Sequence, residues 1–362
     1  MKYWRQILRF LVSLQLLPAL EGGEETLVGG QAVMEGVMMR SPHAWGIAIR
    51  KSSGEITTHC EPLQRPSEKH KWLGWPFVRG LATLGQAMRL GFVASKFSLN
   101  AGLESIAEEE GKKTPKVSAL TMLTNALLSM LLMNAGPEST SGKDGGKKPE
   151  ISTWAVAASM VFSIAFFLFM YKFLPAGATW GLTKRWPALQ GNIAFNLVEG
   201  AIRITVFLLF VWGLSLFKDI KRIYHYHGAE HKTVFAFEDH GMPTVPEAQK
   251  YSTYHPRCGT SFLMTIMLIC IPVYAAFPIQ TLMGKVALRV ALLPVIASVS
   301  YEMIRFSAKH GRSIFALLTK PGLWLQRITT QPPSDDQVEC AIKALDLAMD
   351  LEKKNGGELV IA

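Results

Sequence analysis

Long apolar runs constrain what this chain can fold into. The clearest extends from Ile151 to Leu174 and carries no charge before Lys172. Three more cover residues 195–217, 261–283 and 286–304. A helix needs about 20 apolar residues to cross the hydrocarbon core of a bilayer. The runs therefore predict four transmembrane helices, two within 151–217 and two within 261–304. A weaker apolar stretch, 119–135, is interpreted as an interfacial or marginal helix.

The composition agrees with a membrane protein. Hydrophobic residues make up 49% of the 362 residues and charged residues only 18%, whereas about a quarter are charged in soluble domains. The net charge is +10. Such an excess suits either nucleic acid or loops beside anionic lipid. The apolar runs favour membrane lipids as the partner and argue against nucleic acid. The scattered cysteines indicate no disulfide framework.

Lysine and arginine set the predicted orientation. They are frequent between residues 218 and 257 and again after residue 304, and sparse in the loops between the paired runs. Short cytoplasmic loops of membrane proteins are enriched in these residues. We therefore expect both termini and the loop 218–260 to lie in the cytoplasm.

The other segments differ from the apolar runs. Residues 1–26 predict a basic amphipathic helix on the membrane, with a signal peptide as the alternative. Within 27–110, a cytoplasmic or interfacial region, Trp45–Thr58 predicts a hairpin and 76–103 an amphipathic helix. Residues 111–150 combine the weak apolar stretch with a polar linker.

The tail, 305–362, ends in a predicted amphipathic helix. Ser334 and Gln337 have the spacing of a capping box, and the apolar face is formed by Val338, Ile342, Leu345 and Met349. The predicted fold class is an all-α polytopic membrane protein with about four transmembrane helices, a small hairpin-containing N-terminal portion and a C-terminal amphipathic helix.

Histidines concentrate in the loop between the second and third runs. Five of the nine occur there: His225, His227, His231, His240 and His255. On a helix, His227 and His231 would project from the same face, a spacing that lets two imidazoles bind one divalent metal. Glu230 lies beside them and could accept a proton from a water on that metal. Residues 227–231 also match the H-x-x-E-H pattern of inverted zinc proteases.

A second string begins just before the third run, with His255 and Cys258 three residues apart. The predicted topology brings both strings to one membrane face, and histidine with cysteine favours zinc. Several interpretations remain open. The histidines could simply be solvated, or His227, His231, His255 and Cys258 could close a structural site. The site could instead be open and catalytic, or Cys258 could be a nucleophile assisted by His255.

Ionisable residues within the apolar runs are further candidates. Glu199 and Arg203 are four apart and are expected to pair. Glu302 is a candidate metal ligand, with an ion pair to Arg305 or another arginine as the alternative. Glu35 lies in a glycine-rich segment whose spacing does not fit a dinucleotide-binding loop. It belongs either to a site or to a tight turn.

Several of these strings resemble a known family. They are GGQAVMEGVMMRSP, YHGAEHKTV, HPRCGTSF, SYEMIR and PGLWLQRITTQPPSDDQVECAI. Over residues 27–346 the chain resembles domain-of-unknown-function family 1385, the YqhQ-like bacterial membrane proteins. The resemblance implies a metal-dependent enzyme of the bacterial inner membrane. It places the following residues in family motifs: Glu35, His227, Glu230, His231, His255, Cys258 and Glu302.

The resulting hypothesis is a zinc-dependent hydrolase at the cytoplasmic membrane surface. His227 and His231 are expected to bind the metal together with His255 or Cys258, and Glu230 or Glu35 to act as general base. The substrate would be a peptide or a lipid-linked ester. One alternative is a membrane scaffold or assembly factor with a structural metal. Another is a transporter in which Glu199, Arg203 and Glu302 line the path.

Overall fold

The computed structural model describes residues 28–109, 165–256, 258–279, 281–309 and 314–354. The predictions for residues 1–26 and 111–150 lie outside these ranges. So does most of the first apolar run, of which only residues 165–174 are described.

A small antiparallel sheet lies at one end of the molecule. Its strands follow in chain order: β1 (Gly29–Val33), β2 (Gly36–Arg40), β3 (Ala44–Arg50) and β4 (Ile56–Pro62). Neighbouring side chains alternate between its faces, so Val37 and Met39 point into one apolar cluster and Met38 into another. Because both faces are apolar, both must be covered.

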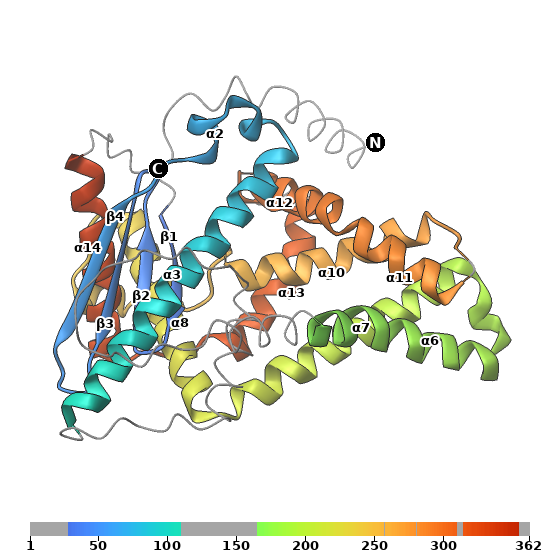
Figure 1. The fold of residues 1–362 in the computed structure, drawn as a ribbon, viewed down its shortest axis with the longest axis horizontal. Coiled ribbons are helices and arrows are strands. Elements are labelled where there is room, and N and C mark those ends of the chain that lie inside the picture. Colours follow the sequence, from blue (N-terminus) through green and yellow to red (C-terminus); the bar gives the residue numbers. More distant parts are fainter. Residues whose placement is uncertain (1–27, 110–164, 257, 280, 310–313, 355–362) are drawn as a thin grey trace, which may run out of the picture.

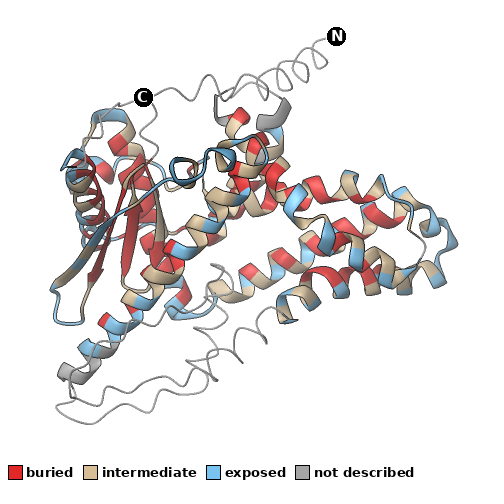
Figure 2. Ribbon diagram, turned by 45° about the horizontal axis from the view of Figure 1, so that its top comes forward, coloured by how far each residue is buried: buried red, intermediate tan, exposed pale blue. Residues whose placement is uncertain are grey.

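Helices cover the two faces, and strands β2 and β3 between them are largely buried (Figures 1 and 2). α3 (Val78–Glu109) packs on one face through Leu90 and Ala94. α14 (Asp335–Lys354) and α8 (Lys218–His240) pack on the other. A Cβ atom at Gly46 would lie 2.8 Å from the carbonyl oxygen of Ala344. The absence of a side chain at this position therefore lets α14 lie directly against β3. The resulting α/β sandwich holds the N- and C-terminal elements together.

Six further helices and one π-helical turn form what we call the helical lobe, which extends away from the sandwich (Figure 1). Its members are the π-helical turn η2 (Phe169–Phe173), α6 (Leu174–Arg185), α7 (Asn192–Ser215), α10 (Gly259–Ala275), α11 (Leu282–Ala291), α12 (Leu293–Lys309) and α13 (Ile314–Thr329). The short elements are α2 (Pro66–Lys69), η1 (Lys71–Gly74), η3 (Pro187–Gln190) and α9 (Val245–Ala248). α8 follows α7 after a break at Leu216 and Phe217, so it leads from the lobe into the sandwich.

The predicted all-α fold with about four transmembrane helices is wrong. The described residues contain a four-stranded sheet. Among them, only α7 is long and apolar enough by itself to cross a membrane, and α11 with α12 would add a second if that pair, bent by 49°, is one span. The run 261–283 yields a helix of only 17 residues, which ends at Ala275. The run 286–304 is divided between two helices at Leu292.

Other local predictions are confirmed. The hairpin at residues 45–58 is β3–β4. The C-terminal helix is α14, where Gln337 accepts a hydrogen bond from the backbone N–H of Ser334, and Val338, Leu345 and Met349 are buried. The helix predicted at 76–103 is α3, but part of its apolar face lies against the sheet.

The predicted loop at 218–260 is mostly the well-packed helix α8.

Candidate metal centre

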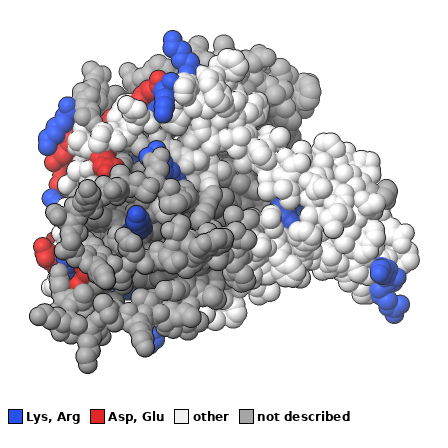
Figure 3. Space-filling view, viewed as in Figure 1, with Lys and Arg blue, Asp and Glu red and all other residues white. Residues whose placement is uncertain are grey.

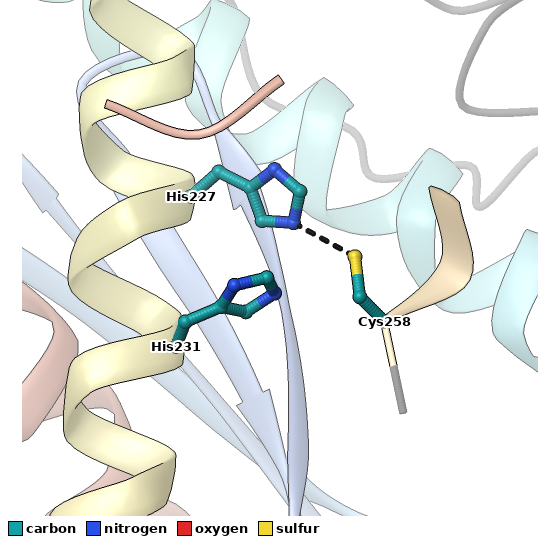
Figure 4. Close-up of side chains that lie close together, drawn as sticks. All are labelled: His227, His231 and Cys258. Carbon is teal, nitrogen blue, oxygen red and sulfur yellow. Dashed lines mark hydrogen bonds between the residues drawn. The ribbon is translucent and has the colours of Figure 1, made fainter. Parts of the chain in front are cut away.

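Two histidines of α8 form the base of the site. His227 and His231 are one helical turn apart and project from the same face of α8 (Figure 4). The centroids of their rings are 4.5 Å apart. This confirms that the two imidazoles share one face of a helix.

Backbone carbonyl groups fix the protonation of both rings. His227 Nδ1 lies 2.8 Å from the carbonyl oxygen of Thr329, and His231 Nδ1 lies 2.5 Å from that of Thr253. A carbonyl oxygen can only accept, so each Nδ1 carries a proton and donates it. In the neutral imidazole this leaves a lone pair on each Nε2. Metal-binding histidines are commonly held in this way.

Cys258 brings a thiol to the same place from the N-terminus of α10 (Figure 4). Its Sγ lies 3.2 Å from His227 Nε2. The ligand atoms of His227, His231 and Cys258 all lie within 4.8 Å of one another. Tetrahedral zinc, with Zn–N of about 2.0 Å and Zn–S of about 2.3 Å, separates its ligand atoms by about 3.5 Å. A contraction of about an ångström would therefore complete this geometry.

The environment of the His231 Nε2 atom also supports a metal site. It is buried and makes no hydrogen bond of ordinary geometry with a described residue, although the Cys258 thiol and Glu230 Oε2, 3.7 Å away, lie beside it. An unsatisfied buried polar atom is costly, and a metal ion would use its lone pair.

Glu230 supplies a carboxylate beside these ligands. Its Oε1 accepts a hydrogen bond of 3.0 Å from the backbone N–H of Gly30 in β1. Its Oε2 lies 3.8 Å from His227 Nε2 and 3.7 Å from His231 Nε2. The sheet therefore holds one oxygen and directs the other toward the candidate metal position.

The charges of the three groups are coupled. Burial alone lowers the pKa of His227, but the adjacent Cys258 raises it to about 9. Burial alone raises the pKa of Cys258, but His227 and His231 hold it well below its ordinary value of 9.0. Without a metal, both directions favour the charged forms of this pair, a thiolate at Cys258 and an imidazolium at His227. The thiolate is also the form of cysteine that binds metals.

His255 lies next to this group but is not part of it. Its ring centroid is 5.6 Å from that of His231 and 4.4 Å from that of Phe235. Burial, followed by the influence of His231, lowers the pKa of His255 to about 4. The Gln326 side chain anchors its backbone at both N–H and carbonyl. Of the two predicted third ligands, the structure brings Cys258 into the cluster.

The two other predicted carboxylates are engaged elsewhere. Glu302 accepts hydrogen bonds of 2.7 and 2.6 Å from the Arg79 guanidinium, one to each oxygen. This is the ion pair foreseen as the alternative, with an arginine other than Arg305. Glu35 occupies the β1–β2 turn with a φ of 58°, where Arg222 pairs with it and the Tyr226 hydroxyl donates to it. Neither belongs to the metal-ligand cluster.

The sequence reading missed the groups that support the site. The carbonyl groups of Thr253 and Thr329 and the N–H of Gly30 belong to the backbone, so residue type gives no signal for them. Gly228 did carry a signal, as a glycine inside a helix. A Cβ atom there would lie 2.1 Å from the carbonyl oxygen of Gln331. The absence of a side chain at Gly228 therefore lets the backbone near Gln331 pack against α8, and the same segment contains Thr329, whose carbonyl contacts His227.

Comparison with known proteins places these residues in a family. The family model "Protein of unknown function (DUF1385)" matches residues 75–351. The chain belongs to this family. It is 32% identical over 332 residues to the uncharacterized protein YqhQ of Bacillus subtilis (strain 168), covering 90% of this chain and 92% of YqhQ. No solved structure matches the chain. The part matched to DUF1385 includes His227, Glu230, His231 and Cys258.

Proposed function

We propose that the chain is a metal-dependent hydrolase whose centre is a zinc-type ion held by His227, His231 and Cys258. One observation carries this proposal. Two Nε2 atoms, each with its Nδ1 proton bound by a carbonyl, converge on the Cys258 sulfur with a carboxylate beside them. Nitrogen and sulfur ligands in this combination suit zinc.

The three ligands that the described residues bring together support catalysis. Catalytic zinc sites use three protein ligands and keep the fourth position open, whereas structural sites use four. Zinc bound here would act as a Lewis acid and lower the pKa of a water toward neutrality. Glu230 Oε2, which lies 3.7 Å from His231 Nε2, would be close to a water bound there. It would accept the water's proton as the water attacks a carbonyl carbon, and return that proton to the leaving group.

The helical lobe supports a place at the bacterial inner membrane. In α7 the most apolar stretch is only 28% buried within the protein. Leu209 and Trp212 of α7 are exposed, as is Leu216 directly after it. The visible surface of the lobe carries few charged side chains (Figure 3). We propose that lipid covers this surface. The metal site, at the junction with the sandwich, would then act on an ester or amide presented at the membrane surface.

A structural metal site is the second candidate, because Glu230 is also close enough to become a fourth ligand after a small shift. The protein would then be a membrane scaffold or assembly factor. Substitution of Glu230 by glutamine separates the two roles. A general base can be replaced without loss of the metal, whereas loss of a fourth ligand weakens metal binding.

The experiment uses detergent-purified full-length protein loaded with Zn²⁺ or Co²⁺. We expect stoichiometric metal in the wild type and in Glu230→Gln, and none in His227→Ala/His231→Ala. His225→Ala is the control, because His225 lies on the same helix but contacts the carbonyl of Pro332. An open position should also bind a hydroxamate and change the Co²⁺ absorption spectrum.

Three results would decide against the hydrolase. The wild type could retain no metal after loading. Glu230→Gln could lose the metal, or hydroxamate could leave the Co²⁺ spectrum unchanged, and both results favour the scaffold. If the metal site is open, a panel of ester and peptide substrates should identify hydrolysis that disappears in Glu230→Gln.

A further inference from the structure

A second group of charged side chains lies inside the helical lobe, away from the candidate metal centre. We call it the lobe cluster. Its members are Lys172 in η2, Asn196, Glu199 and Arg203 in α7, Tyr274 in α10 and Arg289 in α11, and each is at most 4% exposed. Cys258 and Tyr274 lie near opposite ends of α10, so the two sites are about 24 Å apart along that helix.

The cations of the lobe cluster outnumber its carboxylate. Glu199 pairs through one oxygen with Arg203 and through the other with Arg289, at 3.2 Å. Lys172 Nζ donates to the Tyr274 hydroxyl at 3.1 Å. The three cations surround the Tyr274 ring, 5.3 to 5.5 Å from its centroid. One carboxylate against three cations leaves an excess of two positive charges.

Several guanidinium donors in this cluster lack a partner. Arg203 Nη1, Arg289 Nε and Arg289 Nη1 are buried and have no hydrogen-bond partner among the described residues. The two arginines share one carboxylate, so the cluster keeps buried positive charge without a counter-ion, which is costly. Each unsatisfied buried N–H adds to that cost. Contact with the Tyr274 ring offsets part of it. The cluster therefore has both the charge and the free donors to hold an anion.

We propose that the lobe cluster binds a phosphate group. The planar fork of arginine matches phosphate oxygens, and lysine adds a point charge. A phosphate dianion balances the excess charge of this cluster, which a single carboxylate would not. The phosphate belongs either to inorganic phosphate or to the headgroup of an anionic lipid beside the lobe. This inference uses no residue of the metal centre, so it stands or falls independently of the proposed hydrolase.

The test uses full-length protein in a phosphorus-free detergent. Bound phosphorus is measured first, and thermal unfolding is then followed with added inorganic phosphate or with phosphatidic acid in the micelles. We expect either co-purified stoichiometric phosphorus or a rise in Tm on addition. Response to inorganic phosphate identifies the free anion as the ligand. Response to phosphatidic acid alone, with phosphatidylcholine inactive, identifies a lipid headgroup.

Three variants give the comparison. Arg289→Gln and Lys172→Gln each remove one positive charge from the cluster and should weaken the apparent affinity by about tenfold or more. Lys184→Gln removes the same charge from an exposed position at the end of α6 and should respond as the wild type does. If Arg289→Gln does not fold, the comparison of Lys172→Gln with Lys184→Gln decides the test. It leaves Glu199 paired with both arginines.

The proposal is overturned by either of two results. The wild type could carry no phosphorus and show no change in Tm with phosphate or phosphatidic acid. Alternatively, a folded Arg289→Gln or Lys172→Gln could bind phosphate as tightly as Lys184→Gln does.

Discussion

The side chain of Glu230 accepts a hydrogen bond from the backbone N–H of Gly30, 200 positions earlier in the chain. Gly30 belongs to β1, which is an edge strand of the sheet. The outward N–H groups of an edge strand have no neighbouring strand to pair with. Glu230 accepts a hydrogen bond from one of these N–H groups, and this bond holds its carboxylate in place. The sheet, distant in sequence from the histidines, therefore takes part in shaping the candidate site.

Replacement of Gly30 by alanine tests this relationship. A Cβ atom at Gly30 would lie 2.6 Å from Glu230 Cγ and 2.9 Å from the carbonyl oxygen of Met38. We expect Gly30→Ala to displace Glu230 and to destabilise the fold by about 1–3 kcal/mol. Gly29→Ala is the matched control, because the nearest atom to its Cβ among the described residues would be Arg40 Nε, 3.9 Å away. Denaturant unfolding compares the two. Equal stabilities would show that the contact between Gly30 and Glu230 is not needed.

Gly228 provides a test in which propensity and packing oppose each other. Alanine is favoured over glycine by about 1 kcal/mol in a helix interior. At Gly228, however, its Cβ would lie 2.1 Å from the Gln331 carbonyl oxygen. We expect Gly228→Ala to be destabilising and to weaken metal binding, because the carbonyl of Thr329 would move.

Gly102 in α3 is the control for this substitution. No atom of the described residues would lie within 4 Å of a Cβ atom there, so Gly102→Ala should stabilise the protein by up to about 1 kcal/mol. Thermal unfolding measures both changes in stability: we expect a lower Tm for Gly228→Ala and a higher Tm for Gly102→Ala. A Gly228→Ala protein as stable as Gly102→Ala would show that the segment near Gln331 can move away freely.

Glu352 makes stability depend on pH in the acidic range. Burial alone raises the pKa of this carboxyl, but hydrogen bonds from Ser41 and His43 lower it below the ordinary value of 4.5. A lowered folded pKa means that the stabilisation is complete above about pH 4.5. It is lost as the pH falls through the folded value.

We therefore expect Glu352→Gln to be less stable than the wild type near neutral pH, by about 1–3 kcal/mol. It should also lose less stability on acidification. Asp350→Asn serves as the control, since Asp350 is on the same helix and exposed. Urea unfolding between pH 3 and pH 7 provides the measurement. Parallel pH profiles for wild type and Glu352→Gln would exclude this role.

Thiol labelling offers a readout of the metal centre that needs no substrate. Cys60 is exposed, whereas Cys340 is buried and its thiol donates to the carbonyl of Ala48. Burial raises the pKa of Cys340 to about 12. We expect Cys60 to react rapidly with an alkylating agent and Cys340 only after unfolding.

Cys258 should react in the metal-free protein and be protected by zinc, because the bound ion would occupy its sulfur. Mass spectrometry of the labelled peptides separates the sites. Protection of Cys60 by the same zinc concentration would show that the effect is not specific. Equal labelling of Cys258 with and without zinc would contradict its role as a ligand.

Sequence reasoning succeeded where the pattern is local. The alternation and turn of residues 45–58 gave the hairpin, and the spacing of Val338, Leu345 and Met349 gave the buried face of α14. The four-residue separation of His227 and His231 placed both on one face. Glu199 and Arg203 are paired as expected from the same spacing.

Sequence reasoning failed where packing between distant segments decides. β1 and β2 are short, and each contains only one β-branched residue: β1 begins with two glycines, and β2 contains two methionines. Their cover comes partly from α14, some 300 residues later. The hydropathy of residues 286–304 also predicted one continuous helix, whereas α11 ends at Ala291 and α12 begins at Leu293.

The sheet gains one of its two covers from the last described helix. Strands β1–β4 end at Pro62, whereas α14 spans Asp335–Lys354. A ribosome delivers residues in order, so the apolar face formed by Val37, Met39 and Ala48 is made first and waits for nearly the whole chain to be synthesised. Exposed apolar strands are prone to aggregate during that interval. A stop codon before residue 335 would leave the part of this face that lies under α14 permanently uncovered, with only α8 packed on the remainder.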